Sequence, residues 1–151
     1  MKNVFPILAI IVSFCMNDHA HGQSAAERGQ AYLETNKARE EVVTTASGLQ
    51  YEVLREGAGR KPTAADTVEV HYRGTSIDGV EFDSSYSRNS TIEFPLSGVI
   101  RGWTEGVQLM AEGSQYRFVI PSELAYGTRG APPAIGPNEV LVFEIELIAV
   151  R

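Results

Sequence analysis

The sequence predicts an α+β fold in which an antiparallel sheet packs against a single helix. Two observations lead to this prediction. From Ser47 onward, apolar and polar residues alternate with a period of two in several separate runs, which is typical of half-buried strands. One segment, 101–111, has helical spacing instead, and strands and helices do not alternate along the chain, which argues against a parallel βαβ sheet.

Composition restricts the size of the fold and the class of partner. The chain has 151 residues, the length of about one domain. Its content of 43% hydrophobic and 21% charged residues is ordinary for a globular protein. A formal net charge of -6, without a cluster of Lys and Arg, argues against nucleic acid as a partner.

Residues 1–22 have the pattern of a secretory signal peptide. Lys2 precedes an apolar run, Val4–Met16, and the small residues Ala20 and Gly22 stand where a signal peptidase requires them. The run is shorter than the ~20 residues that span a bilayer, so cleavage after Gly22 is favoured over retention as an anchor. We therefore expect an exported protein, periplasmic or secreted.

Cleavage after Gly22 would remove Cys15, the only cysteine, and leave His71 as the only histidine. No disulfide is then possible, and neither a metal site nor a cofactor is expected. A lipid anchor on Cys15 is the less favoured alternative, because Phe14 is bulky where such processing sites carry a small residue.

The segment 23–46 is expected to be helical, with a helix over Ser24–Thr44. Ser24 and Glu27 have the spacing of a capping box, and good helix formers dominate, with Gly29 as the only interior exception. Two alternatives remain for this helix: a solvated element with a lightly apolar face, or a dimerisation element. Its apolar stripe is narrow and consists of Tyr32, Leu33, Ala38, Val42 and Val43.

The remaining chain, 47–151, is expected to form the sheet and its helix. Asp78-Gly79 indicates a tight hairpin turn, and Pro95 should lie at an edge or a bulge. In the helical segment, Trp103, Val107 and Met110 fall on one face. The expected strands are 49–54, 68–73, 81–84, 91–96, 115–121 and 139–150.

Aromatic residues stand beside Gly, Asp or strand-like runs instead of inside one long apolar block. This placement suggests a wall that binds a small apolar group. No nucleophile motif accompanies it, because Ser84 and Ser85 lack a Gly-x-Ser-x-Gly elbow, which argues against a hydrolase. The aromatic residues concerned are Tyr72, Phe82, Trp103, Tyr126 and Phe143.

Six motifs in this part of the chain resemble, in order and spacing, those of the FKBP-type peptidyl-prolyl cis-trans isomerases. The preceding Glu34-Thr35-Asn36 and Ser47-Gly48-Leu49-Gln50-Tyr51 resemble the bacterial Mip-like branch, here with a short N-terminal helix. The resemblance implies a five- to six-stranded sheet curled around one short helix, with a prolyl pocket between them. The motifs are Val70-His71-Tyr72, Asp78-Gly79, Phe82-Asp83-Ser84-Ser85, Val99-Ile100-Arg101-Gly102-Trp103, Ala125-Tyr126-Gly127 and Leu141-Val142-Phe143.

The resemblance also implies roles for individual residues. Asp83, Tyr126 and Phe82 would be catalytic. Asp83 would lie near the reacting carbonyl or orient the loops, and Tyr126 would donate its hydroxyl to the substrate or ligand. The Ile100 N–H would hold a substrate carbonyl, and Ile92 would stand where an aromatic often closes the pocket. The substrate-binding set would be Tyr72, Phe82, Val99, Ile100, Trp103, Tyr126, Ile135 and Phe143, with Trp103 as the floor.

The same residues have simpler interpretations. Tyr72, Phe143 and Trp103 lie on inward faces and could be core alone. Asp83 could satisfy local backbone donors, and His71 is expected to be an exposed or hydrogen-bonded strand histidine and not a base.

Two functions from different classes remain. The first is an exported isomerase that acts on X-Pro bonds of unfolded or partly folded polypeptides and is open to macrolide inhibitors such as rapamycin. The second is a chaperone-like binding module with negligible turnover. In either case we expect a monomer or a weak homodimer.

Overall fold

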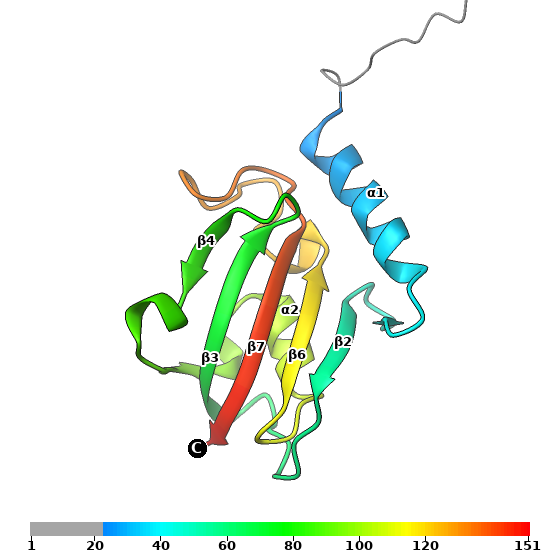
Figure 1. Ribbon diagram of the computed structural model, residues 1–151. Coiled ribbons are helices and arrows are strands. Elements are labelled where there is room, and N and C mark those ends of the chain that lie inside the picture. The colour runs from blue at the N-terminus through cyan, green and yellow to red at the C-terminus, as the bar shows by residue number, and fades with distance from the viewer. Residues whose placement is uncertain (1–22) are drawn as a thin grey trace, which may run out of the picture.

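An antiparallel sheet dominates the computed structural model, which describes residues 23–151 (Figure 1). The predicted signal peptide, with Cys15, lies outside the described residues. Seven strands run through residues 23–151 in the order β1-β2-β6-β7-β3-β4, and β5 pairs with β3 as well. They are β1 (Val43–Thr44), β2 (Gln50–Arg55), β3 (Thr67–Ser76), β4 (Glu81–Ser84), β5 (Ile92–Pro95), β6 (Gln115–Ile120) and β7 (Leu141–Val150), with helices α1 (Ala25–Lys37) and α2 (Arg101–Val107).

The predicted α+β class is confirmed, with a sheet curled around a short helix. All six expected strands are present, and only the two-residue β1 is additional. Short 3-10 turns link them at Tyr86–Arg88, Leu96–Gly98 and Ser122–Leu124. Neither helix in 23–151 is long and apolar enough to cross a membrane.

The core lies between the inner face of the sheet and α2, which sits behind the strands in Figure 1. Alternation along β6 and β7 sends Phe118 and Phe143 to this inner face, where they are cross-strand partners. Helix α2 can lie directly on β6 because it carries glycine where it touches the strand. A Cβ on Gly102 would be 2.5 Å from Ile120, and one on Gly106 would be 2.6 Å from Phe118.

Helix α2 is shorter than the expected 101–111, because it ends at Val107. The chain then tightens: Leu109 N–H donates to the Gly106 carbonyl and Met110 N–H to the Val107 carbonyl, both three residues back. Met110 therefore still reaches the core, where it is fully buried. The apolar spacing read from the sequence was right, although the helix stops one turn early.

The expected helix over Ser24–Thr44 is wrong in its last third, since α1 ends at Lys37. Four β-branched residues follow at 42–45, and they favour extended backbone. Val43 and Thr44 pair with Tyr51 and Gln50 of β2. The start of the helix is as expected, because the Ser24 hydroxyl accepts the Glu27 N–H at 3.1 Å.

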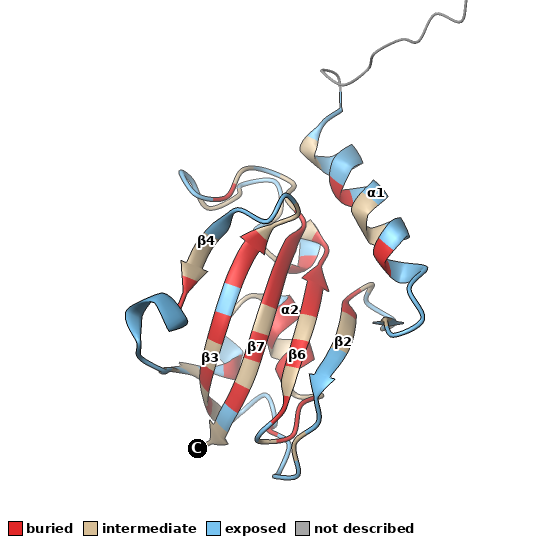
Figure 2. Ribbon diagram, viewed as in Figure 1, coloured by how far each residue is buried: buried red, intermediate tan, exposed pale blue. Residues whose placement is uncertain are grey.

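Helix α1 packs on the outer face of its own sheet. Tyr32 and Leu33 contact a second apolar cluster of Val119, Val140 and Val142. Gly29 is buried there, and a Cβ at this position would lie 2.7 Å from a methyl group of Val140. Figure 2 shows the buried positions of α1 against the exposed remainder of the helix. Two residues of the apolar stripe, Tyr32 and Leu33, are therefore packed on the chain's own sheet, whereas Ala38 and Val43 are exposed.

Polar contacts fix α1 in this position. The Asn36 side chain, which is buried, donates to Gln50 at 2.7 Å, and Gln50 donates back to the Leu33 carbonyl at 3.0 Å. Arg28 forms an ion pair with Asp78 in the β3–β4 turn at 2.6 Å. The helix is thus tied to β2 at one end and to the β3–β4 turn at the other.

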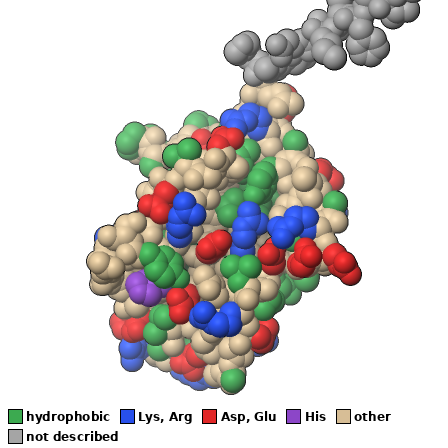
Figure 3. All heavy atoms as spheres, in the orientation of Figure 1, with side chains coloured by type: hydrophobic (Ala, Val, Ile, Leu, Met, Phe, Trp, Pro, Cys, Tyr) green, Lys and Arg blue, Asp and Glu red, His purple; other side chains and the backbone are tan. Residues whose placement is uncertain are grey.

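The rest of the outer face is charged. Across four neighbouring strands, Glu52 pairs in register with Arg117, Arg117 with Glu144, and Glu144 with Arg73. Figure 3 shows basic and acidic side chains interspersed over this face. Alternating charges opposite one another stabilise this register, and no single sign of charge accumulates.

Candidate active site

A pocket of about 780 Å³ opens between the inner face of the sheet and the start of α2. Strands β3, β4, β5 and β7 form one side, and the loop 125–135 closes the other. The structure brings every site residue expected from the sequence to this one pocket. They are Tyr72, Phe82, Asp83, Val99, Ile100, Trp103, Tyr126, Ile135 and Phe143.

Trp103 lies at the centre of an aromatic box. It is 4% exposed, and three rings meet it edge to face: Tyr72 at 5.2 Å between centroids, Phe143 at 5.4 Å and Phe94 at 5.5 Å. Phe82 stands edge-on to Phe143 at 5.5 Å and extends the wall outward. Edge-to-face packing locks each ring through its neighbours, so the box is preformed.

Phe94, which the sequence analysis missed, supplies the aromatic that was sought at Ile92. Both side chains line the pocket, because they are two residues apart on β5 and so share a face. The period of two within the expected strand 91–96 could have identified Phe94, because Phe94 shares a strand face with Ile92.

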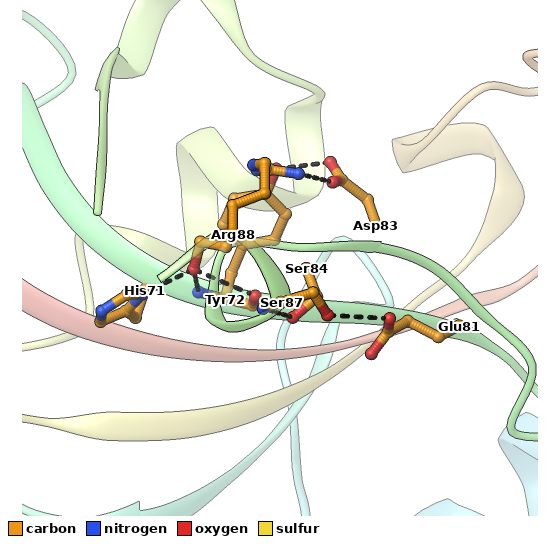
Figure 4. A network of polar contacts seen from close by, with 8 residues as sticks. His71, Tyr72, Glu81, Asp83, Ser84, Ser87 and Arg88 are labelled. Atoms are coloured by element: carbon orange, nitrogen blue, oxygen red, sulfur yellow. Dashed lines mark hydrogen bonds and ion pairs between the residues drawn. The ribbon is translucent and has the colours of Figure 1, made fainter. Parts of the chain in front are cut away.

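A polar group of three side chains stands at the rim: Tyr72, Asp83 and Arg88 (Figure 4). The Tyr72 hydroxyl donates to one Asp83 carboxylate oxygen, and Arg88 donates to the other at 2.7 Å. Arg88 also donates to the Tyr72 hydroxyl at 3.2 Å. Arg88 was not anticipated either, since it lies in the turn after β4 and only the fold brings it back over Tyr72.

The pKa of Asp83 reports on this group. Partial burial disfavours the charged carboxylate, but the hydrogen bonds from Tyr72 and Arg88 and the charge of Arg88 outweigh it and lower the pKa below 3.8. Burial, followed by the hydrogen bond to Asp83, raises the pKa of Tyr72. At neutral pH the carboxylate is therefore ionised and the phenol is a donor.

The two serines after Asp83 serve the backbone. Ser85 is fully buried, and its hydroxyl accepts the Tyr72 N–H at 2.7 Å, while Ser84 accepts the Ser87 N–H at 3.3 Å. Side chains so engaged fix the β4 turn and are not exposed nucleophiles. They fix the end of β4, the strand that carries Asp83.

His71 lies outside the pocket, on the outer face of β3. Its Nδ1 is 2.8 Å from the Ser85 hydroxyl, and its ring stacks on Tyr86 at 4.6 Å. This agrees with the expectation of a hydrogen-bonded strand histidine. His71 does not line the pocket and so does not contact a group held against Trp103.

Two donors at the pocket are free of protein acceptors within residues 23–151. The Ile100 carbonyl accepts from Trp103 and Thr104, but no acceptor faces the Ile100 N–H. The Tyr126 hydroxyl, on a side chain that is 41% exposed, likewise has no protein partner there. Both are placed to meet a polar ligand atom at the mouth of an otherwise apolar site.

The loop 125–138 covers the pocket. Ala131 and Ile135 pair through two backbone hydrogen bonds of 2.8 and 3.1 Å, and Ile135 is buried against the core. Within the described part of the chain, no group of three or more His, Cys, Asp or Glu side chains could hold a metal ion. The pocket combines an apolar aromatic box with a few polar donors at its edge.

This fold and this pocket are suited to a compact apolar group that is flanked by polar atoms. Comparison with known proteins gives the family. Residues 58–148 match the family model described as FKBP-type peptidyl-prolyl cis-trans isomerase, and residues 13–53 match the domain that precedes it in such proteins. The chain belongs to the FKBP-type peptidyl-prolyl cis-trans isomerase family.

Relatives place it near the FkpA and Mip proteins. A probable FKBP-type isomerase FkpA of Neisseria meningitidis is 50% identical over 87% of this chain and 48% of its own length. The outer membrane protein MIP of Legionella longbeachae is 47% identical over 82% of this chain and 53% of its own. The chain thus spans about half the length of these curated relatives.

A solved structure agrees. A peptidyl-prolyl cis-trans isomerase from Pseudomonas syringae superposes with a TM-score of 0.79, at 43% identity, over 83% of this chain and 92% of the other.

Proposed function

We propose that this protein is a peptidyl-prolyl cis-trans isomerase that acts on X-Pro bonds of exported polypeptides. The observation that carries the proposal is the aromatic box around Trp103, which is preformed, apolar and open to the surface. Family membership supports the same activity. The protein would use the pocket without a metal, a cofactor or a covalent intermediate.

The chemistry follows from the amide. Rotation about an X-Pro bond disrupts resonance and has a barrier near ~20 kcal/mol. In the twisted transition state the carbonyl oxygen carries less negative charge and the nitrogen is pyramidal, so this state is less polar than either planar isomer. An apolar pocket therefore binds the transition state more tightly than the ground states, which is the condition for catalysis.

The residues divide into three roles. Trp103 would floor the prolyl ring, with Tyr72, Phe82, Val99, Ile135 and Phe143 as the wall. The free N–H of Ile100 and the hydroxyl of Tyr126 would hold substrate carbonyls outside the apolar zone. Asp83, ionised and fixed by Tyr72 and Arg88, would face the carbonyl of the bond that rotates.

Export is part of the proposal. Residues 1–22 have the pattern of a signal peptide, and one relative is named as an outer membrane protein. The domain division would be 1–22 for the signal, 23–46 for the N-terminal segment and 47–151 for the isomerase domain. A periplasmic or secreted location would bring the pocket to unfolded, proline-containing chains.

A protease-coupled isomerisation assay tests the activity. The mature chain, from residue 23, should accelerate cis/trans exchange in a tetrapeptide with Leu or Phe before Pro, because an uncharged aromatic wall favours such residues. Rapamycin should inhibit it by occupying the same pocket. A folded protein that leaves the rate at the buffer value would refute the enzyme and favour the chaperone-like binding module.

A further inference from the structure

A second hollow of about 500 Å³ lies next to the prolyl pocket, and the two share Val99 in their walls. It runs along the outside of α2, from Ser97 past Arg101 to Leu124. The prolyl pocket and this hollow adjoin at Val99. A polypeptide whose proline enters the prolyl pocket can therefore continue across Val99 into the hollow.

The N-terminal segment builds one side of this hollow. Thr45 donates to a Glu105 carboxylate oxygen at 2.6 Å, and Ser47 donates to the other. The turn 45–48 is thereby fastened to α2. Both carboxylate oxygens of Glu105 therefore accept hydrogen bonds from within the protein, and these bonds stabilise its negative charge.

Arg101 supplies the free charge. It is exposed, lines the hollow, and has no ion-pair partner among residues 23–151. Glu105 also lines the hollow, but the Thr45 and Ser47 hydroxyls engage its two carboxylate oxygens, and the other lining side chains are apolar or neutral polar. Arg101 stands two residues before Trp103 at the start of α2. Since an extended chain advances ~3.3 Å per residue, a substrate residue within a few positions of the proline would reach Arg101.

We infer that this hollow is a second substrate subsite, and that Arg101 makes it prefer an acidic residue two or three positions from the proline. The inference rests on the proposed function only in assuming that the proline occupies the Trp103 pocket. Arg101 is here a specificity-determining residue and takes no part in bond rotation.

The test measures binding of nonapeptides with a central Leu-Pro. One series carries Glu, and a matched series Lys, at the second or third position on either side of that pair. NMR titration of the mature chain should give about two- to fivefold tighter binding for one Glu position, the scale of an exposed charge pair. Backbone amides of Arg101 and Glu105 should shift together with the Trp103 indole. Added salt should reduce the preference.

Arg101→Gln should abolish the preference, and Arg101→Glu should reverse it toward Lys. Lys61→Gln, which removes an exposed charge away from both hollows, should leave it intact. Equal affinities for the Glu and Lys series, or a preference that survives Arg101→Gln, would overturn the inference.

Turnover is measured separately on a neutral tetrapeptide. Loss of turnover with a retained Glu preference would refute the isomerase and leave the subsite standing. Normal turnover without a Glu preference would refute the subsite and leave the isomerase standing.

Discussion

Asp83 concentrates the polar chemistry of the pocket. Among residues 23–151, it is the only carboxylate in the lining, and Tyr72 and Arg88 hold it in place. Replacing it with Leu should lower kcat/KM tenfold or more, equivalent to about 1.4 kcal/mol of transition-state stabilisation. The measurement is the protease-coupled assay on the mature chain, with folding checked by circular dichroism.

His71→Ala is the control for this experiment, since His71 faces Ser85 and Tyr86 on the outer face. It should change kcat/KM little. Greater damage from His71→Ala than from Asp83→Leu would contradict the pocket mechanism.

Phe82 tests the wall instead of the polar group. Phe82→Ala removes the ring that faces Phe143 and should also lower kcat/KM tenfold or more. Because the ring is partly buried, the change should cost up to about 3 kcal/mol of stability. Urea denaturation separates the two effects, and unchanged activity in a folded variant would remove Phe82 from the site.

The pKa of Asp83 gives a prediction that needs no substrate. Since the folded chain lowers this pKa below 3.8, the carboxylate contributes stability that is fully present above that value and is lost as pH falls through the lowered pKa. NMR titration of the Asp83 carboxyl should give a midpoint below 3.8. Arg88→Gln should raise the midpoint, and an unchanged midpoint would show that Arg88 does not stabilise the charge.

Most of the individual residues that line the pocket could be predicted from the sequence. Trp103, Phe82 and Tyr126 stand in motifs whose spacing could be compared with a family, and all three line the pocket. Phe94 and Arg88 were missed for a physical reason. Arg88 gains its role through a contact with Tyr72, 16 residues away, which no local motif records. The period of two places Phe94 on the same strand face as Ile92, but it does not record the contact of Phe94 with Tyr72 on another strand.

Among the elements, α1 departs most from expectation. The apolar stripe could be identified from the sequence. Nothing in the local sequence indicates that Gly29 allows the helix to approach Val140 closely. The β-branched run after it has strand propensity, yet only pairing with β2 makes it a strand. The strands β3, β6 and β7 were predictable because each buries one face continuously.

Gly29→Val tests how α1 is docked. Valine has a better helix propensity than glycine, yet its side chain would overlap Val140 and should cost about 1–3 kcal/mol. Ala31→Val, on the exposed face of the same helix, should change stability by only about 0.5 kcal/mol. Urea denaturation measures both, and equal effects would show that α1 does not rest on the sheet.

Deletion of residues 23–44 should separate stability from catalysis. It would uncover Val119, Val140 and Val142 and leave Gln50 without Asn36, so the unfolding midpoint should fall. Activity on short peptides should not change, because α1 lies on the outer face and the pocket on the inner one. Lost activity in a deletion variant that is still folded would show that the outer face supports the site.

For the whole molecule, the use of the α1 stripe bears on assembly. A standard stable interface buries roughly 800 Å² per partner, and Tyr32 and Leu33 are already packed on their own sheet. We expect a monomer, or a dimer that dissociates in the micromolar range or above. Analytical ultracentrifugation of the mature chain at submicromolar concentration decides this, and a persistent dimer would reveal an interface elsewhere on the domain.

Strand β7 lies between β6 and β3, although it is the last strand along the chain. Its side chains Phe143 and Ile145 pair with Phe118 and Tyr72 at the centre of the core. Until 141–150 has left the ribosome, β3 and β6 have no common neighbour, and the core stays open. Such long-range pairing also slows folding. A chain that cannot complete its sheet early stays unfolded longer, and an unfolded chain is what the proposed export would require.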